Sequence, residues 1–256
     1  MIINHNMNAM NAQRNMGLNT GIAAKSMEKL SSGLRINRAG DDAAGLSISE
    51  KMRSQIRGLD QAKRNAQDGV SRIQTSEGAL NEVSDMLVRM KELAVQQQNL
   101  GTYSTDDIAN VGLEMDALAA EINNIFTTTK FNGTSAFAAS VIAIDDQAAT
   151  LTIAAATISA ALAVTKASTS VLIDTAIVGV NTARATYGSQ QNQLEHIANN
   201  LGTTSENLQS SESRVRDTDM AKEMVNFSKN NVLSQAAQAM IAQANQQPQG
   251  VLQLLR

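Results

Sequence analysis

The fold of this chain is decided by residues 56–98, which read IRGLDQAKRNAQDGVSRIQTSEGALNEVSDMLVRMKELAVQQQ. Small and apolar residues recur there every seventh position, and a second set stands three residues after members of the first. The two sets are Leu59, Ala66, Ile73, Leu80, Leu87 and Ala94, and Ala62, Gly69, Ser76, Val83 and Met90. Because a repeat that averages 3.5 residues keeps one face of a helix turned toward a partner helix, we predict a long coiled-coil helix from about Ala44 to about Gln98.

Two more segments carry such a seam, the row of residues that faces a partner helix. One predicts a helix over about 170–213, and its seam residues are Val180, Tyr187, Leu194, Leu201, Leu208 and Val215, with Ala183, Gln190, Ile197, Thr204 and Ser211 between them. The other predicts a helix over 105–126, which begins at a capping signal made by Ser104 and Asp107. This helix should fold back antiparallel on the first, so that three seams bury one another in a bundle.

The composition indicates a mainly α, elongated protein. Aromatic residues make up 2% of the chain and proline occurs once, so we expect neither a large globular core nor many helix breaks. The apolar content is instead aliphatic and includes twelve methionines, which suits narrow contacts between helices. The predicted fold is an antiparallel coiled-coil rod with a small β-hairpin region, whose terminal helices pair into an inner coiled coil.

The helical pattern is interrupted over about 130–165. Phe131, Asn132 and Gly133 offer a tight Asn-Gly turn. Alternating apolar residues at 141–144 and 151–153 predict a short β-hairpin. The segment is too short to form an independent domain.

No catalytic or metal-binding constellation can be recognised in the sequence. Cysteine is absent, which excludes disulfides and thiolate sites. His5 and His196 lie far apart and are expected to be structural or solvated, and the carboxylate pair Asp145-Asp146 lacks the ligand count of a calcium loop. A net charge of -3 gives no electrostatic argument for binding nucleic acid or a membrane. We predict neither enzymatic activity nor a cofactor.

The two ends of the chain lack the apolar surface for a core of their own. Residues 1–33 and 222–256 are weakly amphipathic, and such helices fray in water unless a partner covers them. We therefore expect neighbouring copies of the chain to order them, in preference to permanently disordered tails. The expected contacts in the polymer core are Met16, Ala23, Leu30, Met224, Phe227, Met240, Leu252 and Leu255.

Glycines inside the predicted helices need a reason, because glycine destabilises a helix by about 1 kcal/mol relative to alanine. Gly69 lies in the seam, where it permits a close backbone approach. Gly78 lies off the seam, which indicates either a second contact surface for another molecule or simple tolerance of glycine. Glycines and mixed charge also predict joints at 34–46 and 214–221.

Four strings of this sequence resemble the bacterial flagellins. LSSGLRINRAGDDAAGLSISEKM at 30–52 and IRGLDQAKRNAQDGVSRIQTSEGAL at 56–80 are similar to the N-terminal signature of that family. ESRVRDTDMAKEMVNFSKNN at 212–231 and LSQAAQAMIAQANQQPQGVLQLLR at 233–256 resemble its C-terminus. The resemblance covers about residues 1–130 and 175–256.

This resemblance implies a structural subunit that self-assembles into the bacterial flagellar filament, the helical propeller of swimming cells. A hook–filament junction protein is the alternative. By the same resemblance, 1–33 and 222–256 would form an inner core domain, and the joints would connect it to an outer rod domain at 47–213. The rod would contain helices at about 47–98, 105–126 and 170–213. Larger relatives insert further domains in the middle, so this chain resembles a minimal member.

The resemblance also implies further partners and a route out of the cell. Export would run through the flagellar type III system without a cleaved signal peptide. An export chaperone would hold the C-terminal segment. The filament cap and the hook-junction proteins would be neighbours in the extracellular flagellum.

Flagellins are recognised by a vertebrate innate immune receptor, and the stretch 88–96 resembles the family's contact run. Arg89 and Leu93 keep contact positions in it, and Glu114 on the next helix corresponds to a third. Val88 and Lys91 depart from the family pattern. Arg89 and Glu114 are equally compatible with charges that pack neighbouring subunits. The adjacent methionine, at position 90, belongs to the intramolecular seam and should face inward.

Overall fold

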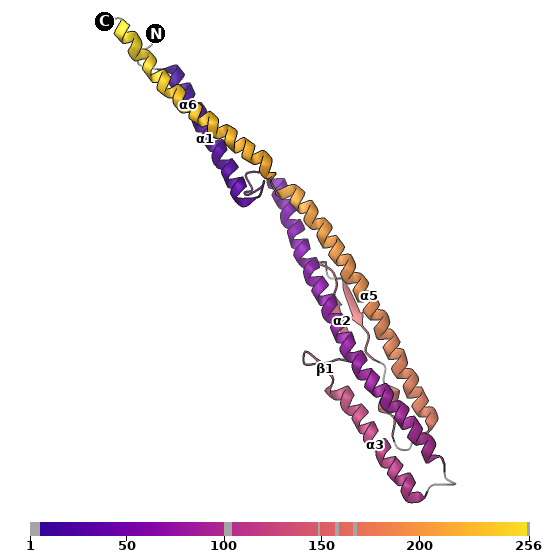
Figure 1. Cartoon of the computed structure of the whole chain (residues 1–256). Coiled ribbons are helices and arrows are strands. Elements are labelled where there is room, and N and C mark those ends of the chain that lie inside the picture. Colours follow the sequence, from indigo (N-terminus) through magenta and orange to yellow (C-terminus); the bar gives the residue numbers. More distant parts are fainter. Residues whose placement is uncertain (1–5, 100–103, 148, 157–158, 166–167, 255–256) are drawn as a thin grey trace. The chain divides into compact units, whose positions relative to one another are not determined.

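The computed structural model describes residues 6–99, 104–147, 149–156, 159–165 and 168–254. Its elements are α1 (Met7–Ser32), α2 (Ala43–Gln97), α3 (Thr105–Thr128), β1 (Lys130–Phe131), β2 (Thr134–Ser135), β3 (Ser140–Ala143), β4 (Thr150–Ile153), α4 (Ser159–Leu162), α5 (Ser170–Arg216) and α6 (Met220–Leu254). The protein is mainly α, as predicted (Figure 1). Its internal contacts divide it into a terminal unit, Met1–Ser54 with Leu208–Arg256, and a central unit, Gln55–Asn207.

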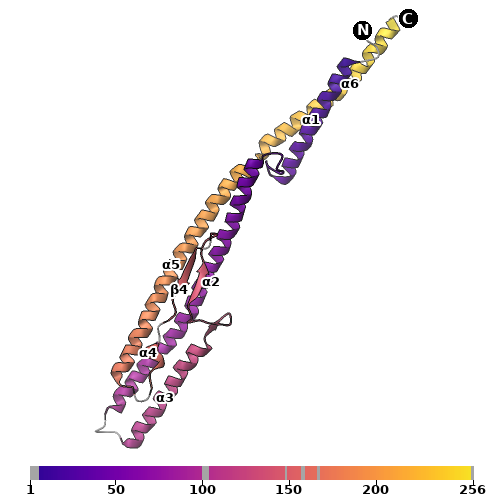
Figure 2. The same cartoon turned by 180° about the vertical axis from the view of Figure 1, so that it is seen from behind.

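The core of the central unit is built on the predicted seam of α2. Every residue of the two α2 sets is buried, from Leu59 at one end to Ala94 at the other. On α5 the larger seam residues are buried as far as Leu201, and Thr204 beyond them is exposed. The two helices lie side by side in both views (Figures 1 and 2). The heptad prediction is thus confirmed for α2 and for most of α5.

The third predicted seam belongs to α3, which begins at the predicted cap. The Ser104 hydroxyl oxygen accepts the Asp107 N–H at 3.2 Å, and the Asp107 carboxylate accepts the Ser104 N–H at 3.1 Å, which completes a capping box. Hydrogen bonds from the Ser104 hydroxyl and N–H lower the pKa of Asp107. Met115, Ile122 and Phe126 of α3 are buried, and they belong to the same hydrophobic core as residues of α2 and α5.

Two antiparallel hairpins follow α3. β1 pairs with β2 through Asn132 and Gly133, whose φ angles of 48° and 80° fit a type I′ turn. β3 pairs with β4, with Ile142 opposite Leu151 (Figure 2). The Asn-Gly turn and the hairpin are therefore both confirmed, whereas α4 was not expected from the sequence.

Two glycines of α2 make room for the β3–β4 hairpin. A Cβ atom at Gly69 would overlap Cδ1 of Ile142 and would lie 3.1 Å from Cδ1 of Leu194. A Cβ atom at Gly58 would lie 2.6 Å from Cβ of Asp146. The sequence predicts a close backbone approach at Gly69, but the groups that approach are side chains, foremost Ile142 of the hairpin.

Replacing Gly69 with alanine should destabilise the central unit by about 1–2 kcal/mol, because Ile142 must leave its packed position. Gly78→Ala is the matched control, since nothing lies within 4 Å of a Cβ atom there. That control should stabilise α2 by about 1 kcal/mol through helix propensity alone. The midpoints of urea denaturation, followed by circular dichroism, should shift in opposite directions. Equal shifts would contradict a packing role for Gly69.

A buried polar layer fixes the segment after β2 against α2. The Arg72 guanidinium donates to the carbonyl oxygens of Ser135 at 3.0 Å and Ala138 at 2.6 Å. The Ser76 hydroxyl donates to the carbonyl oxygen of Ala136 at 2.9 Å. These side chains therefore supply hydrogen-bond donors to three carbonyl groups of β2 and the residues after it.

The joint between α1 and α2 is tied to the joint between α5 and α6 within the terminal unit. α1 ends at Gly33, whose φ of 73° is the left-handed conformation common after helices. Leu34 then forms an antiparallel bridge with Asp217. The Arg35 N–H donates to the Arg216 carbonyl oxygen at 2.6 Å, which holds the two chain segments together.

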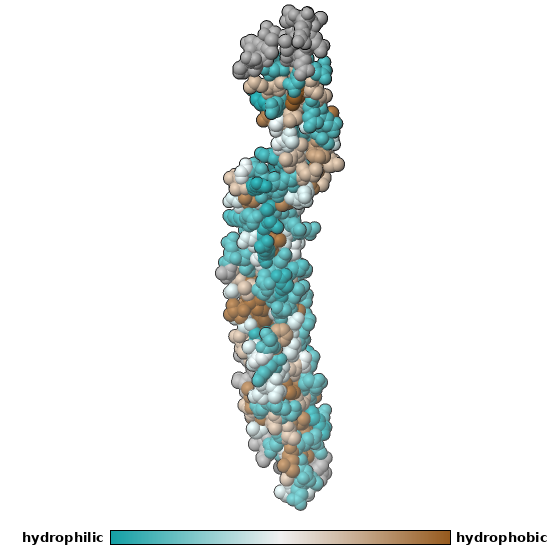
Figure 3. Space-filling view, turned by 90° about the vertical axis from the view of Figure 1, so that its left-hand side faces the viewer, coloured by the Kyte–Doolittle hydropathy of each residue, from teal (hydrophilic) through white to brown (hydrophobic). Residues whose placement is uncertain are grey.

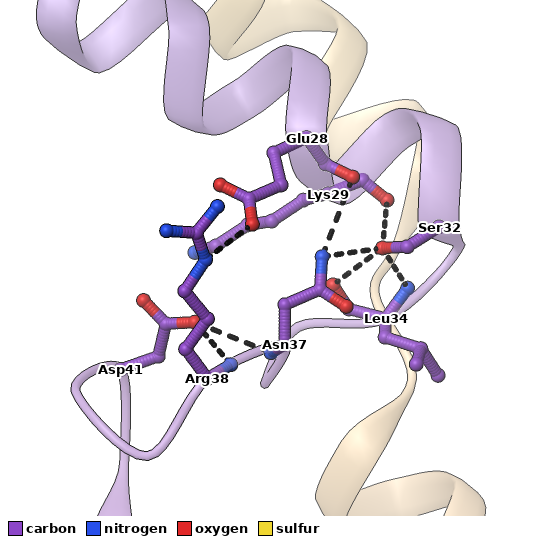
Figure 4. Close-up of polar contacts among 7 residues, drawn as sticks. All are labelled: Glu28, Lys29, Ser32, Leu34, Asn37, Arg38 and Asp41. Atoms are coloured by element: carbon purple, nitrogen blue, oxygen red, sulfur yellow. Dashed lines mark hydrogen bonds and ion pairs between the residues drawn. The ribbon is translucent and has the colours of Figure 1, made fainter.

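Local polar contacts shape the rest of this joint (Figure 4). Arg38 Nε lies 2.9 Å from the Glu28 carboxylate, and the Asn37 amide donates to the Ser32 hydroxyl at 2.8 Å. The Asp41 carboxylate accepts the backbone N–H of Arg38 at 3.0 Å and of Asn37 at 3.2 Å. Those two bonds lower the pKa of Asp41, so it remains ionised at neutral pH.

The predicted joints at 34–46 and 214–221 are longer than those in the structure. α2 already begins at Ala43, and α5 continues to Arg216. The Arg216 guanidinium, at the end of α5, lies 2.5 Å from the Glu50 carboxylate of α2. This ion pair links the two helices. Polar contacts between distant residues thus extend both helices into segments whose composition resembles a linker.

Candidate functional site

α1 and α6 pack against each other in the terminal unit (Figures 1 and 2). Asn6 caps α1, because its side-chain oxygen accepts the Ala9 N–H at 3.2 Å. The amide of the same side chain donates to the Ala244 carbonyl oxygen on α6 at 2.7 Å. One short polar residue therefore starts α1 and links it to α6.

The seam between α1 and α6 contains mostly small or polar side chains. Its half-buried and buried residues recur at spacings of three and four, as in a coiled coil. They are Ala9, Ala12, Met16, Asn19, Ala23, Ser26 and Leu30 on α1, and Glu223, Phe227, Asn230, Ser234, Ala237, Ile241 and Ala244 on α6. Little apolar surface is buried between the two helices, so their pairing gains little hydrophobic stabilisation.

Most of the larger apolar residues of the two helices lie outside this seam and are exposed, whereas Met16, Leu30, Phe227 and Ile241 lie in it. The exposed ones are Met7, Met10, Leu18, Ile22 and Met27 on α1, and Met220, Met224, Val225, Val232, Leu233 and Met240 on α6. The apolar residues of α6 are spread around the helix instead of gathered on one face. In the space-filling view, tan and brown residues lie between teal ones on the surface of this unit (Figure 3). Helices that expose their largest apolar residues are candidate surfaces for association.

The surface of α6 is also hollowed where these residues gather. One shallow groove of about 520 Å³ is lined by Met224, Val225, Ser228, Lys229, Val232 and Leu233. Its lining is almost entirely apolar. Such a groove can receive apolar side chains from another helix in the way that a coiled-coil hole receives a knob.

Some of the residues predicted to contact other copies are exposed, and others lie in the α1–α6 seam. Met224 and Met240 are exposed by 53% and 63% in the unpaired subunit. Met16, Ala23, Leu30 and Phe227 are half-buried in the α1–α6 seam. Leu252 lies within the last turn of α6, and Leu255 lies outside the described residues.

Sequence reasoning did not select the exposed residues Val225, Val232 and Leu233 of α6. Val225 and Val232 are seven residues apart, but the positions between them that would complete a seam are Ser228 and Lys229, so periodicity did not mark an apolar face. The signal that could have found them is the contrast between bulky apolar residues and the small residues three or four positions away. That contrast marks a helix whose bulky side faces something other than its intramolecular partner.

A second candidate site is the charged cluster on α2 and α3. Arg89 forms ion pairs with Glu114 at 2.9 Å and with Glu92 at 3.0 Å, and all three side chains are about half exposed. Hydrogen bonds to Glu114 and Glu92 raise the pKa of Arg89. The predicted contact residue Leu93 differs, because it is only 1% exposed and packs in the core of the central unit. The cluster therefore presents charge to solvent, and the Leu93 side chain does not reach the surface.

The described residues hold no further chemistry that suggests a reaction. Among them, no group of three or more His, Asp or Glu side chains could hold a metal ion. His196 is exposed on α5, and His5 lies outside the described residues. No helix in the described part of the chain has the length and hydropathy needed to cross a bilayer.

Comparison with known proteins covers almost the whole chain. The family model for the bacterial flagellin N-terminal helical region matches residues 3–141, and that for the bacterial flagellin C-terminal helical region matches residues 171–255. A flagellin of Halalkalibacterium halodurans is 54% identical over 274 residues, and the flagellar filament 33 kDa core protein of Treponema phagedenis is 47% identical over 288 residues. Both alignments cover 100% of this chain and 100% of the relative. The crystal structure of Bacillus cereus flagellin is 33% identical, covers 54% of this chain and 88% of that chain, and has a TM-score of 0.47. The chain therefore belongs to the bacterial flagellin family.

Proposed function

We propose that the exposed apolar faces of α1 and α6 are the surfaces through which copies of this flagellin bind one another. As a flagellin, the chain is a structural subunit that self-assembles into the flagellar filament outside the cell, and it is not an enzyme. The observation that carries the proposal is the inverted distribution of side chains. Most residues between α1 and α6 are small or polar, whereas most of the bulky apolar residues lie outside. Burial of those bulky residues by neighbouring subunits would supply the free energy of assembly.

The same distribution supports the domain assignment. Residues 1–33 and 222–256 would form the inner core domain of the subunit, and 47–213 its outer rod. Residues 34–46 and 214–221 would connect the two. The core of the rod is complete within one chain, whereas the inner domain requires neighbours.

Sheared filament fragments should elongate when purified subunit is added, because each added copy covers the apolar faces of the last. Trypsin should cleave the free subunit first after exposed basic residues of α1 and α6, namely Arg14, Lys25, Lys222 and Lys229. The same sites should be protected at least tenfold in the polymer. Electron microscopy and peptide mapping report the two effects. A subunit that never extends a seed, or whose terminal cleavage is unchanged in the polymer, would contradict the proposed contacts.

No comparison favours the hook–filament junction alternative. A fluorescently labelled subunit distinguishes the two positions in living cells. Label along the whole filament identifies a filament subunit, and label confined to the filament base identifies a junction protein.

We also propose the partners that family resemblance implies for the subunit before and during assembly. Export would use the flagellar type III route, without a cleaved signal peptide. A chaperone would bind the C-terminal segment, and the exposed apolar residues of α6 supply a surface that an export chaperone could shield. The filament cap and the hook-junction proteins would contact the subunits at the two ends of the filament.

The charged cluster of Arg89 and Glu114 is a proposed contact for the vertebrate innate immune receptor. Leu93 is excluded as a direct contact by its burial. Arg89 and Glu114 are exposed in the subunit and are held in one arrangement by their ion pair. A receptor surface with complementary charges could use both.

Arg89→Glu should lower receptor signalling by about tenfold or more, because it places a third carboxylate beside Glu92 and Glu114. Arg64→Glu is the control, since Arg64 is equally exposed on α2 but bonds only to Gln61 among the contacts described for it. The subunit should lose less than about 1 kcal/mol of stability in either variant. An epithelial reporter cell line measures signalling. Equal signalling by Arg89→Glu and the wild type would remove Arg89 from the interface.

A further inference from the structure

The methionines of this flagellin are divided sharply between its two units. The sequence contains twelve. In the described part of the chain, those exposed by about half or more all lie on α1 or α6: Met7, Met10, Met27, Met220, Met224 and Met240. Met90 and Met115 of the central unit are 0% exposed. Solvent therefore reaches thioether sulfur mainly on the faces proposed for assembly.

An exposed thioether is the group in this chain most easily altered by peroxides. Cysteine is absent, so no thiol competes for the oxidant. When hydrogen peroxide reacts with methionine, an S–O bond forms and the O–O bond breaks. The sulfur loses two electrons, and the departing oxygen takes up a proton and leaves as water. The product is a sulfoxide, a polar group in place of a flexible apolar one.

We propose that these six exposed methionines form an oxidation-sensitive site that controls entry of the subunit into the filament. The proposal rests on the polymer contacts proposed above. In the reduced state the six side chains are buried against neighbouring copies. As sulfoxides they keep the subunit out of the polymer until a methionine sulfoxide reductase restores them.

The position of two of these residues explains why oxidation would act on assembly. Met224 lines the apolar groove of α6 together with Val225 and Val232. Met240 lines a second groove, between α6 and α1, together with Ala12. A sulfoxide oxygen in the Met224 groove would lose its hydration when a neighbour docks and would find few donors in the apolar lining, which opposes burial. The Met240 groove also contains Asn8 and Asn11, so the opposition to burial would be smaller there.

The sensitivity would belong to the free subunit and not to the polymer. Neighbouring copies that cover α1 and α6 would also cover the six sulfurs. Met90 and Met115 of the central unit would be unaffected in both states, because they are enclosed in its core, and Met86 is half-buried against that core. Oxidation would therefore prevent free subunits from joining the filament but would not disassemble existing filament.

The test begins with free subunit treated with hydrogen peroxide, with the sulfoxides located by peptide mass spectrometry. We expect oxidation at the six exposed methionines to exceed that at Met90 and Met115 by at least tenfold. Seeded elongation by the oxidised subunit should be at least tenfold slower than by untreated subunit. Treatment with both methionine sulfoxide reductases should restore it, while assembled filament should resist the same dose.

A variant with leucine at all six positions is the matched control, because leucine keeps the apolar volume and the helix propensity. After peroxide it should elongate seeds within twofold of its own untreated rate, whereas Met90→Leu should remain as sensitive as the wild type. If the sixfold variant does not assemble, two threefold variants, one on each helix, should each retain part of the resistance.

The outcomes separate this inference from the proposed contacts. Untreated subunit that fails to elongate seeds contradicts the contacts themselves. Oxidised subunit that carries the six sulfoxides and elongates at the untreated rate overturns only the methionine site. Equal inhibition of the leucine variants and the wild type overturns it as well.

Discussion

Val225→Asp combined with Val232→Asp should raise the critical concentration for filament assembly by about a hundredfold or more. Both valines are exposed on α6, by 67% and 64%, and both line its apolar groove. A carboxylate that must be buried against a neighbouring copy opposes docking by about 2 kcal/mol or more at each position. Each 1.4 kcal/mol corresponds to a factor of about ten in affinity. Sedimentation of polymer from a dilution series measures the change.

Val178→Asp is the matched control for this loss of assembly. Val178 is 64% exposed on α5 in the central unit, so this substitution adds one carboxylate at the same exposure as each of the two on α6. Assembly of this variant should stay within about threefold of the wild type, because a solvated surface charge alters stability by less than about 0.5 kcal/mol. If both variants assembled normally, the exposed face of α6 would not be a contact surface. If both failed, the effect would come from charge alone.

Leu80→Ala should destabilise the central unit by about 2–5 kcal/mol, the largest stability change expected for one substitution in this chain. Leu80 is fully buried in the α2 seam, in the core shared by α2, α3 and α5. Removing its branched methyl groups leaves a cavity that rigid helices can close only in part. Urea denaturation followed at 222 nm by circular dichroism (the wavelength of the helical signal) should show a lower midpoint with a similar slope.

Leu172→Ala provides the comparison, because Leu172 is 57% exposed on α5. The same atoms are removed, but no enclosed cavity forms, so the free energy of unfolding should change by less than about 0.5 kcal/mol. A similar loss in both variants would mean that hydrophobic burial in the α2 seam does not determine the stability of the central unit.

The central unit was the most predictable part of this flagellin, and the reason is physical. A residue repeated every seven positions must face the same partner along the whole helix, so sequence spacing alone identifies the buried side. Leu59 and Ala94 lie at opposite ends of the α2 seam and are both buried as predicted. The Asn132-Gly133 turn was equally predictable from the sequence, because few dipeptides tolerate two successive positive φ angles.

The buried Arg72 shows what periodicity leaves out. It lies next to the seam residue Ile73, and its charge predicts a solvated position. The structure buries it because the carbonyl oxygens of Ser135 and Ala138 converge on it from a segment more than sixty residues away. No spacing within one helix encodes such a partner. The hydrogen bonds between the two joints could not be predicted for the same reason, because Leu34 and its bridge partner Asp217 are far apart in the sequence.

In the terminal helices, the heptad pattern identifies the face that packs inside the chain but not the face that is exposed. Met16, Ala23 and Leu30 follow a heptad and lie in the seam between α1 and α6. Val225 and Val232 are seven residues apart but lie outside that seam, and the surface that they are proposed to meet belongs to other copies. A helix with several neighbours carries several overlapping patterns, and a single period reveals the one inside the chain.

The Asn132-Gly133 turn has a practical consequence for engineering. Its two residues are exposed, and β1 and β2 bring the chain back to nearly the same point on either side of it. A foreign peptide inserted there would begin and end at adjacent positions, which is the condition under which a host fold tolerates an added loop. Each protomer would carry one copy, so the polymer would become a regular lattice for displaying epitopes or enzymes.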